Sequence, residues 1–445
     1  MIESFLREVQ LQIASKEARS YVGEEVEQHL QRSKQSYIDQ GDDEALAEQK
    51  AVRDMGSCMQ LGRAMNKLHK PKIDWLLLGL VFLALGLGFV PLMLVGEMSL
   101  YIEKLIHIAI AVTIIISLYF FDYRVIWQGR WMIFVFVIMG YLLSGIFAGM
   151  SIDDYSVMTI GSWMLTNEPF IALYVIAWAA VLSIKKATIK YVIGFFIFTS
   201  LATFLETSVP VTVGYMLVTL VMIFASHHSV KEKLSVGVAA IGSLGFMIYA
   251  QSAFFRARIE TVLQPEHYSN GSGNMTLLIE EVRATAGMYG AKEPIVIPDN
   301  TSDFALLNVL QHFGYSGIII IGLVLGGLLL KLLWNARMIK QPFGRLIVQG
   351  AALYYGCKLL FSLLALCGFT EFFNMYTPFL SFGFENLFVN AVFIGLVLSV
   401  YRRKSFEERM KPRKVKVDSE PVQVPEPKTR LGKFLHVFFG MEDEK

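Results

Sequence analysis

The stretch WLLLGLVFLALGLGFVPLMLV, from Trp75 to Val95, contains no charged residue and is long enough to cross a membrane. A hydrocarbon core about 30 Å thick needs about 20 predominantly apolar residues in a helix. Similar runs recur along the rest of the chain, which is 54% hydrophobic, above the roughly 45–50% of a soluble domain. These runs predict an all-α, polytopic membrane protein.

We predict about ten transmembrane helices between this stretch and residue 404. One outer connection, 255–314, is much longer than the others and separates the seventh and eighth helices. Such long connections are usually functional or disordered. The helical pattern of 275–285 indicates that this one is an ordered outer cap. The predicted spans are 75–95, 104–121, 131–149, 168–184, 189–205, 211–226, 234–254, 315–334, 346–368 and 385–401.

Basic residues are confined to alternate short connections between the predicted spans, and the intervening connections carry acidic residues instead. Cytoplasmic loops are enriched in Lys and Arg, so both termini are predicted to be cytoplasmic and the 255–314 connection extracellular. Lys104, at the outer edge of the second span, is the one exception. The net charge of +2 is too small to indicate a nucleic-acid partner. The inner basic residues include Arg124, Arg130, Lys185, Lys186, Lys231, Lys233, Arg337, Lys340, Arg345, Arg402 and Arg403.

Three domains follow from these patterns. Residues 1–72 are polar and are predicted to form a cytoplasmic helical domain, residues 73–404 the membrane domain, and residues 405–445 a cytoplasmic tail that is charged, Pro-rich and disordered. Residues 45–69 resemble the permease-prefix domain found ahead of membrane segments in some Firmicutes proteins, and this resemblance implies no chemistry.

Apolar residues of the first domain recur at helical spacing, as at Phe5, Val9 and Ile13. Gly41 and Gly56 interrupt the pattern. We therefore expect about three helices in this domain.

The segment IPDNTSDFALLNVLQHFGYSG, residues 297–317, carries the strongest chemical signal of the outer connection. A proline and a cluster of small polar residues near the beginning of the segment are typical of the start of a helix, and Gly314 is typical of its end. They predict a short helix from about Ser302 to Phe313. Asp303 would then lie in the first turn, where the helix dipole favours an ionised carboxylate that can act as a general base. On the residues alone, Asp303 and Asp299 could equally be capping carboxylates.

Four cationic side chains are further candidates. Lys358 lies near the middle of the ninth predicted span, where a lysine is costly unless it faces a polar cavity or a partner charge. Arg256, Arg258 and Arg283 lie on the outer connection, and guanidinium groups bind phosphate oxygens bidentately. A buried ion pair or a misplaced span boundary is the alternative for Lys358, and a solvated surface is the alternative for the arginines.

The outer segment resembles the SEDS glycosyltransferases, which polymerise the glycan strands of bacterial cell wall. Their large loop carries a Pro-Glu-x-His-Thr-Asp-Phe motif before a helix that ends Gly-x-x-Gly, and residues 298–304 occupy that pattern here. AGMYG, residues 286–290, and TPFLSFG, residues 377–383, are similar to two further family segments. Glu168 in LTNEPF resembles the Glu of the family's Gln-Pro-Ser-Glu segment. The resemblance covers roughly residues 75–404.

The chain departs from the family pattern at several of these positions. Thr301 stands where the motif has His, Ser302 where it has Thr and Asp299 where it has Glu, while Asp303 is retained. The family's usual acidic pair in the following helix is replaced by Gln311 and His312. These departures leave open that the chain is a weak or inactive relative.

The resemblance implies a peptidoglycan glycosyltransferase that polymerises lipid II, with inversion, at the outer membrane face. Asp303 would be the general base, and cationic groups or a divalent cation such as Mg²⁺ would meet the charge of the leaving undecaprenyl diphosphate. The implied partner protein is a class B penicillin-binding protein. Two alternatives stay open: a flippase for the lipid-linked precursor, and a non-catalytic scaffold that recruits a transpeptidase. The candidate substrate-binding residues are Asp299, Glu168, Lys358, Arg256, Arg258 and Ser302.

Overall fold

The computed structural model describes residues 1–14, 16–69, 72–129, 132–133, 135–139, 150–152, 155–160, 163–165, 168–184, 189–206, 209–269, 271 and 273–404. The described chain divides into two compact units, one containing Met1–Ile73 and the other Asp74–Val400. The predicted tail, 405–445, lies outside the described residues, as does most of the predicted span at 131–149.

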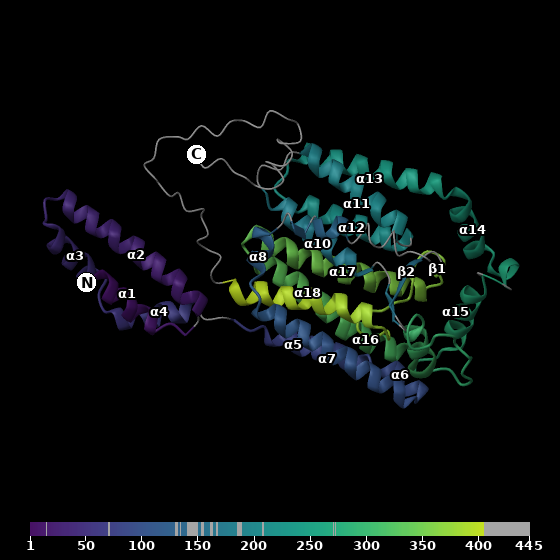
Figure 1. Cartoon of the computed structure of the whole chain (residues 1–445). Coiled ribbons are helices and arrows are strands. Elements are labelled where there is room, and N and C mark those ends of the chain that lie inside the picture. Colours follow the sequence, from purple (N-terminus) through teal and green to yellow (C-terminus); the bar gives the residue numbers. More distant parts are fainter. Residues whose placement is uncertain are drawn as a thin grey trace. The chain divides into compact units, whose positions relative to one another are not determined.

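The first unit consists of four helices rather than the predicted three (Figure 1). The apolar residues Phe5, Val9 and Ile13 form its buried core, as their spacing predicts. The additional break follows α1, which ends at Leu11. The helical spacing of the apolar residues continues across this break, so the sequence gives no sign of it. Gly41 and Gly56, both with positive φ, follow α2 and α3 as C-terminal glycines commonly do. The helices are α1 (Ile2–Leu11), α2 (Lys16–Asp39), α3 (Glu44–Asp54) and α4 (Cys58–His69).

Within the described residues, six helices of the second unit are long and apolar enough to cross a membrane. Three shorter apolar helices correspond to the predicted fourth, fifth and sixth spans. The chain is therefore a polytopic helical membrane protein, and nine of the ten predicted spans appear as helices. The long spans are α5 (Trp75–Leu87) with α6 (Val90–Val95), α7 (Met98–Phe120), α13 (Val230–Ala250), α16 (Ala305–Met338), α17 (Pro342–Leu366) and α18 (Phe384–Arg403); the shorter helices are α10 (Glu168–Leu182), α11 (Ile189–Glu206) and α12 (Val209–Phe224).

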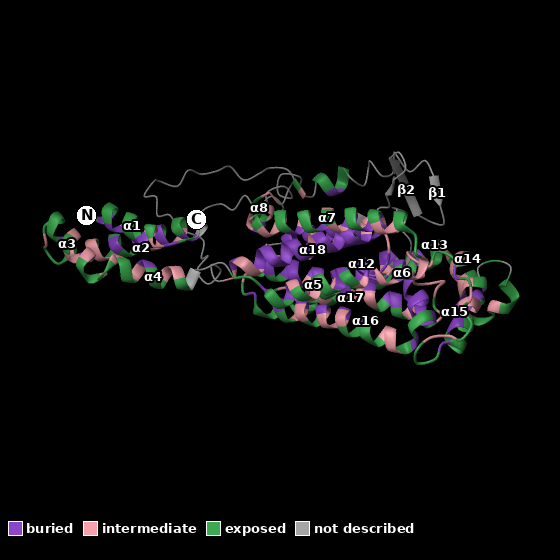
Figure 2. Ribbon diagram, turned by 90° about the horizontal axis from the view of Figure 1, so that it is seen from below, coloured by how far each residue is buried: buried purple, intermediate pink, exposed green. Residues whose placement is uncertain are grey.

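The core of this unit surrounds α10 and α17. Helix α17 packs against α10, α12 and α16, and Figure 2 shows the buried residues concentrated in α12, α17 and α18. A buried polar chain joins three helices: the Trp178 indole donates to the Tyr215 hydroxyl at 2.6 Å, which donates to Thr199 Oγ1 at 2.6 Å. Polar groups buried in a bundle need such partners, so this chain fixes α10, α11 and α12 against one another.

A small sheet is the only strand structure among the described residues. Strands β1 (Met150–Ile152), β2 (Tyr155–Ile160) and β3 (Trp163–Leu165) pair antiparallel in sequence order. The sheet lies in the connection predicted to join the third and fourth spans. It adds a local β element to a fold that is otherwise helical, as predicted.

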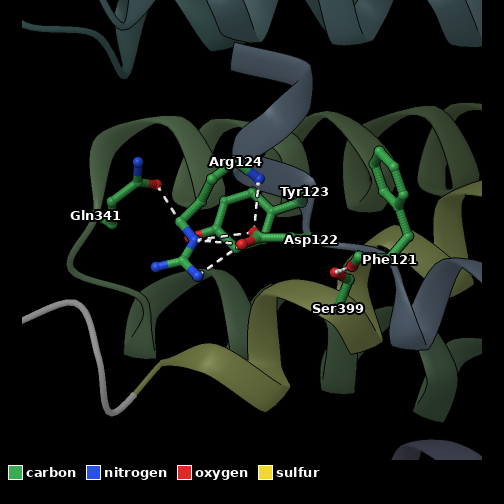
Figure 3. A network of polar contacts seen from close by, with 6 residues as sticks. All are labelled: Phe121, Asp122, Tyr123, Arg124, Gln341 and Ser399. Carbon is green, nitrogen blue, oxygen red and sulfur yellow. Dashed lines mark hydrogen bonds and ion pairs between the residues drawn. The ribbon is translucent and has the colours of Figure 1, made fainter. Parts of the chain in front are cut away.

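A polar network surrounds the short helix α8 (Tyr123–Gln128) at one end of the bundle (Figure 3). Asp122 accepts the backbone N–H of Arg124 at 3.0 Å and pairs with its guanidinium at 2.6 Å. Tyr123 donates to Gln341 at 3.4 Å, and Ser399 donates to the carbonyl of Phe121 at 2.5 Å. These contacts join α8 to the start of α17, and the end of α7 to α18.

The long connection 255–314 forms an ordered cap at the opposite end of the bundle from α8 (Figures 1 and 2). It contains α14 (Ser252–Leu263), a 3₁₀ turn (Pro265–Tyr268) and α15 (Gly273–Thr285). Helix α15 confirms the helical pattern predicted for 275–285. The sequence did not predict α14, because its charged residues end the apolar run after α13.

Candidate active site

The conspicuous segment 298–304 is a series of turns that precedes α16. Asp299 has a left-handed φ of 48°, a conformation that Asp and Asn adopt more readily than most side chains. Its carbonyl accepts the N–H groups of both Ser302 and Phe304 at 3.2 Å. These bonds keep the chain out of helical geometry as far as Phe304, so the helix begins at Ala305 and not at Ser302 as predicted.

This later helix start changes the surroundings of Asp303. Phe304 is the N-cap of α16, so Asp303 lies just outside the first turn in which it was predicted, where the dipole of the helix has less effect. Its side chain is exposed. The turn itself is held from within the helix, because Asn308 donates to the carbonyl of Asn300 at 3.1 Å.

The AGMYG segment closes a break in α16. At Gly314 the backbone leaves helical geometry, with φ 65° and ψ −160°, which confirms Gly314 as the end of the short helix. A break exposes N–H groups that have no partner within the helix. Here Tyr315 and Ser316 donate to the carbonyls of Gly287 and Met288 at 3.2 and 3.0 Å.

The TPFLSFG segment, residues 377–383, is a compact and strained turn. Phe379 has a φ of 64°, and Leu380 N–H donates across it to the carbonyl of Pro378 at 2.8 Å. Non-Gly residues held at positive φ cost energy and persist only where surrounding contacts enforce them. Such contacts are present, since Ser381 Oγ accepts the N–H of Thr377 at 3.0 Å and Asn386 donates to the carbonyl of Thr377 at 3.1 Å.

The structure brings these two motifs together. The backbone N–H of Phe382 donates to the carbonyl of Thr301 at 2.8 Å. This bond joins the turn that carries Asp303 to the loop between α17 and α18, which lies far away in sequence. The two segments singled out separately in the sequence therefore form one site at the capped end of the bundle.

A buried cation lies beneath this site. Lys104 of α7 is 1% exposed, and its ammonium donates to the carbonyls of Phe379 and Ser381 at 3.4 and 3.3 Å. It also lies 6.0 Å from the centroid of the Phe382 ring. The sequence marked Lys104 only as an exception to the charge pattern. The rule that intramembrane charges are functional, applied above to Lys358, could have identified it.

Two arginines of the cap contact backbone carbonyls of the chain itself. Arg258 donates to the carbonyl of Glu371 and its guanidinium lies 4.0 Å from the centroid of the Phe254 ring. Arg283 donates to the carbonyl of Cys367 at 2.9 Å. Partial burial raises the pKa of the Glu371 carboxyl, while the nearby Arg258 charge opposes the rise. These contacts attach α14 and α15 to the loop that follows α17.

The remaining predicted residues are distributed around the bundle. Lys358 is buried in α17, as its predicted depth requires, and Arg256 is exposed on α14. Ser302 is half-buried within the turn. Glu168 is the first residue of α10, and its side chain is not among those that the structure describes. Within the described ranges, no group of three or more His, Cys, Asp or Glu side chains is placed to hold a metal ion.

A half-buried lysine of α16 was not singled out in the sequence. Lys331 of α16 pairs with Asp74 at 2.9 Å, and Asn335 donates to the same carboxylate at 2.8 Å. Asp74 also caps α5 by accepting the N–H of Leu77 at 3.1 Å. Because Asp74 directly precedes the first apolar run and Lys331 lies near the end of the eighth, spacing along the chain gives no sign of the pair.

Comparison with known proteins supports the resemblance to the SEDS family. No protein-family model matches the chain. The chain is 23% identical over 192 residues to FtsW of Geobacter sp. (strain M18), a probable peptidoglycan glycosyltransferase. This match covers 42% of this chain and 52% of that protein. The corresponding protein of Bacillus subtilis (strain 168) is 23% identical over 161 residues, covering 35% and 40%. The chain thus matches about half the length of these curated relatives.

Solved structures extend the likeness to most of the chain. A chain of a peptidoglycan synthase complex that coordinates polymerization and crosslinking aligns with a TM-score of 0.61 at 18% identity, covering 75% of this chain and 98% of that one. The rod shape determining protein RodA of Thermus thermophilus aligns with a TM-score of 0.54 at 16% identity, covering 75% and 97%. These structural matches show the fold of polytopic helical membrane proteins.

Proposed function

We propose that this chain, which has the fold and sequence resemblance of the SEDS proteins, is a peptidoglycan glycosyltransferase that polymerises lipid II. The observation that carries the proposal is the bond between Phe382 N–H and the Thr301 carbonyl. It unites the two motif segments beside an exposed carboxylate, that of Asp303. A reaction between two large lipid-linked sugars needs such an accessible group at the membrane boundary, where both substrates can approach it.

The reaction is a single displacement. The hydroxyl of the incoming lipid-linked disaccharide attacks the anomeric carbon of the growing glycan, and the bond from that carbon to the undecaprenyl diphosphate breaks. Attack from the opposite side converts an α-linked donor into a β-linked product. Asp303 takes the proton of the attacking hydroxyl, which a positioned carboxylate can do at neutral pH.

The leaving diphosphate carries negative charge and needs cations rather than an acid. Arg256, which is exposed on α14, and Lys358, which is buried in α17, are the candidates in this proposal. Arg258 and Arg283 instead attach the cap through backbone carbonyls, so their first role is to position α14 and α15. Asp299 shapes the turn through its backbone.

The proposed orientation places the cap and Asp303 outside the cell and both termini inside. The positive-inside distribution of the short connections supports it. The helical unit containing Met1–Ile73 would then be cytoplasmic. A class B penicillin-binding protein is the proposed partner, since a similar solved chain belongs to a complex that couples polymerization with crosslinking.

Purified full-length chain supplied with lipid II tests the proposal, with the glycan product separated by length on a gel. We expect polymer that grows with time and is digested by a muramidase. Precursor that crosses sealed vesicles without being polymerised would indicate a flippase instead. Failure to form polymer or move precursor, together with capture of a transpeptidase, would indicate a scaffold.

A further inference from the structure

The Lys104 ammonium donates to two backbone carbonyls of a strained turn. Phe379 is held at positive φ, and the turn around it directs the carbonyls of Phe379 and Ser381 toward α7. Each carbonyl is a strong acceptor that requires a partner when it is buried. Lys104 supplies donors to both, from a helix that lies more than 270 residues earlier in sequence.

A glycine in the first predicted membrane span leaves space for this contact. Gly88 lies between α5 and α6, and a Cβ atom there would approach the Phe379 carbonyl oxygen to 2.6 Å and Lys104 Cε to 2.8 Å. Glycine is the residue that permits so close an approach of two backbones. Three segments, at Gly88, Lys104 and 377–383, therefore meet at one point.

The contact continues to the proposed active site in one further step. Phe382 follows Ser381 directly, and its N–H donates to the carbonyl of Thr301, in the turn that carries Asp303. His107, one helical turn from Lys104, packs against the rings of Phe382 and Phe384 with centroids 5.7 and 5.5 Å apart. The loop is thus fixed from α7 on its membrane side.

We propose that Lys104 is a positioning residue, whose ammonium sets the 377–383 loop and through it the turn that carries Asp303. Its importance for catalysis rests on the proposed function, whereas its control of the loop does not. A buried cation that served only to hold the helices together would leave the mobility of the distant 298–304 turn unchanged when it was removed. That difference can be measured.

Hydrogen exchange followed by mass spectrometry tests the proposal on the full-length chain. Lys104→Met should speed exchange about tenfold or more in peptides covering 377–386 and 298–308, since local opening frees these amides. Lys331→Met is the control, because it also removes a lysine from a membrane helix, but a half-buried one that pairs with Asp74 at 2.9 Å instead of with the carbonyls of the 377–383 loop. In that variant, exchange in those two peptides should not rise relative to the other membrane helices, because a general loss of stability speeds exchange throughout the chain.

A second pair of variants covers the case in which Lys104→Met does not fold. Gly88→Ala retains the charge but crowds the same contact, and it should produce the same pattern of faster exchange. Gly79→Ala is its matched control, since a Cβ atom there would meet nothing within 4 Å. Unchanged exchange at 298–308 in both Lys104→Met and Gly88→Ala would overturn the proposal.

Polymerisation gives the independent second readout. Lys104→Met should lower kcat about tenfold and leave lipid II binding near that of the parent, because a displaced base affects the transition state more than the ground state. Faster exchange with unchanged kcat would refute the positioning role. If the parent itself forms no polymer, the proposed function fails, and the exchange data alone decide whether Lys104 controls the loop.

Discussion

Replacing Gly314 by Ala tests the idea that AGMYG and the break in α16 form one rigid unit. The backbone at this residue has φ 65° and ψ −160°, a region open essentially to glycine, and a conformation of this kind costs other residues about 1–3 kcal/mol. A Cβ atom would also approach the Gly287 carbonyl oxygen to 2.3 Å and Gly290 N to 2.5 Å. Overpacking of this kind typically costs a further ~1–3 kcal/mol, so we expect Gly314→Ala to destabilise the protein by about 2–6 kcal/mol.

The assay is thermal unfolding of the purified chain in detergent, with Gly326→Ala as the matched control. Gly326 lies in the same helix, and a Cβ atom there would meet nothing within 4 Å. Gly326→Ala should therefore melt within about a degree of the parent or slightly above it, because Ala favours helix over Gly. If both variants melt together, the break in α16 is not fixed by its contact with residues 286–290, and our account of that contact is wrong.

Three further predictions concern other parts of the second unit. Lys331→Met should destabilise the protein by about 3–5 kcal/mol, because it leaves the Asp74 carboxylate buried without its cation, and chemical denaturation should show that adding Asp74→Asn restores part of the loss. Burial raises the pKa of Glu371 above its unfolded value, so the folded state binds more protons and stability is lost as pH rises through that pKa. Between pH 4 and 8, the melting temperature of Glu371→Gln should therefore fall less than that of the parent. A membrane-impermeant thiol reagent applied to intact cells should label Tyr289→Cys but not Lys231→Cys, and the reverse pattern would invert the predicted topology.

Sequence patterns were most informative where a property is repeated along the chain. Apolar runs about 20 residues long are rare in soluble domains, and within the described residues nine of the predicted spans correspond to apolar helices. Gly314 was recognised because glycine is the residue that most readily adopts the left-handed backbone conformation at the end of a helix. The start of the same helix was predicted three residues early. The turn that begins at the left-handed Asp299 keeps the chain out of helical geometry for longer than a simple cap would.

Contacts between distant segments were not predictable from spacing. Nothing near Lys104 in sequence indicates that the carbonyls of Phe379 and Ser381 will be its partners, because those carbonyls become available only through the strained turn. The same holds for Asp74 and Lys331. Each of these lysines could be recognised as unusual because it adjoins or interrupts an apolar run, but its partner and therefore its role required the fold.

The most direct test of the central claim compares two carboxamide variants in the polymerisation assay. Asp303→Asn keeps the shape of the side chain but cannot accept a proton from the attacking hydroxyl, so we expect polymerisation to fall by a factor of about 10² or more. Asp299→Asn should retain most activity, since Asn also adopts the left-handed conformation that Asp299 has here. Lipid II binding and thermal stability should stay close to the parent in both. If Asp303→Asn polymerises like the parent, Asp303 is not the base; if Asp299→Asn alone is inactive, the wrong carboxylate of the turn has been assigned.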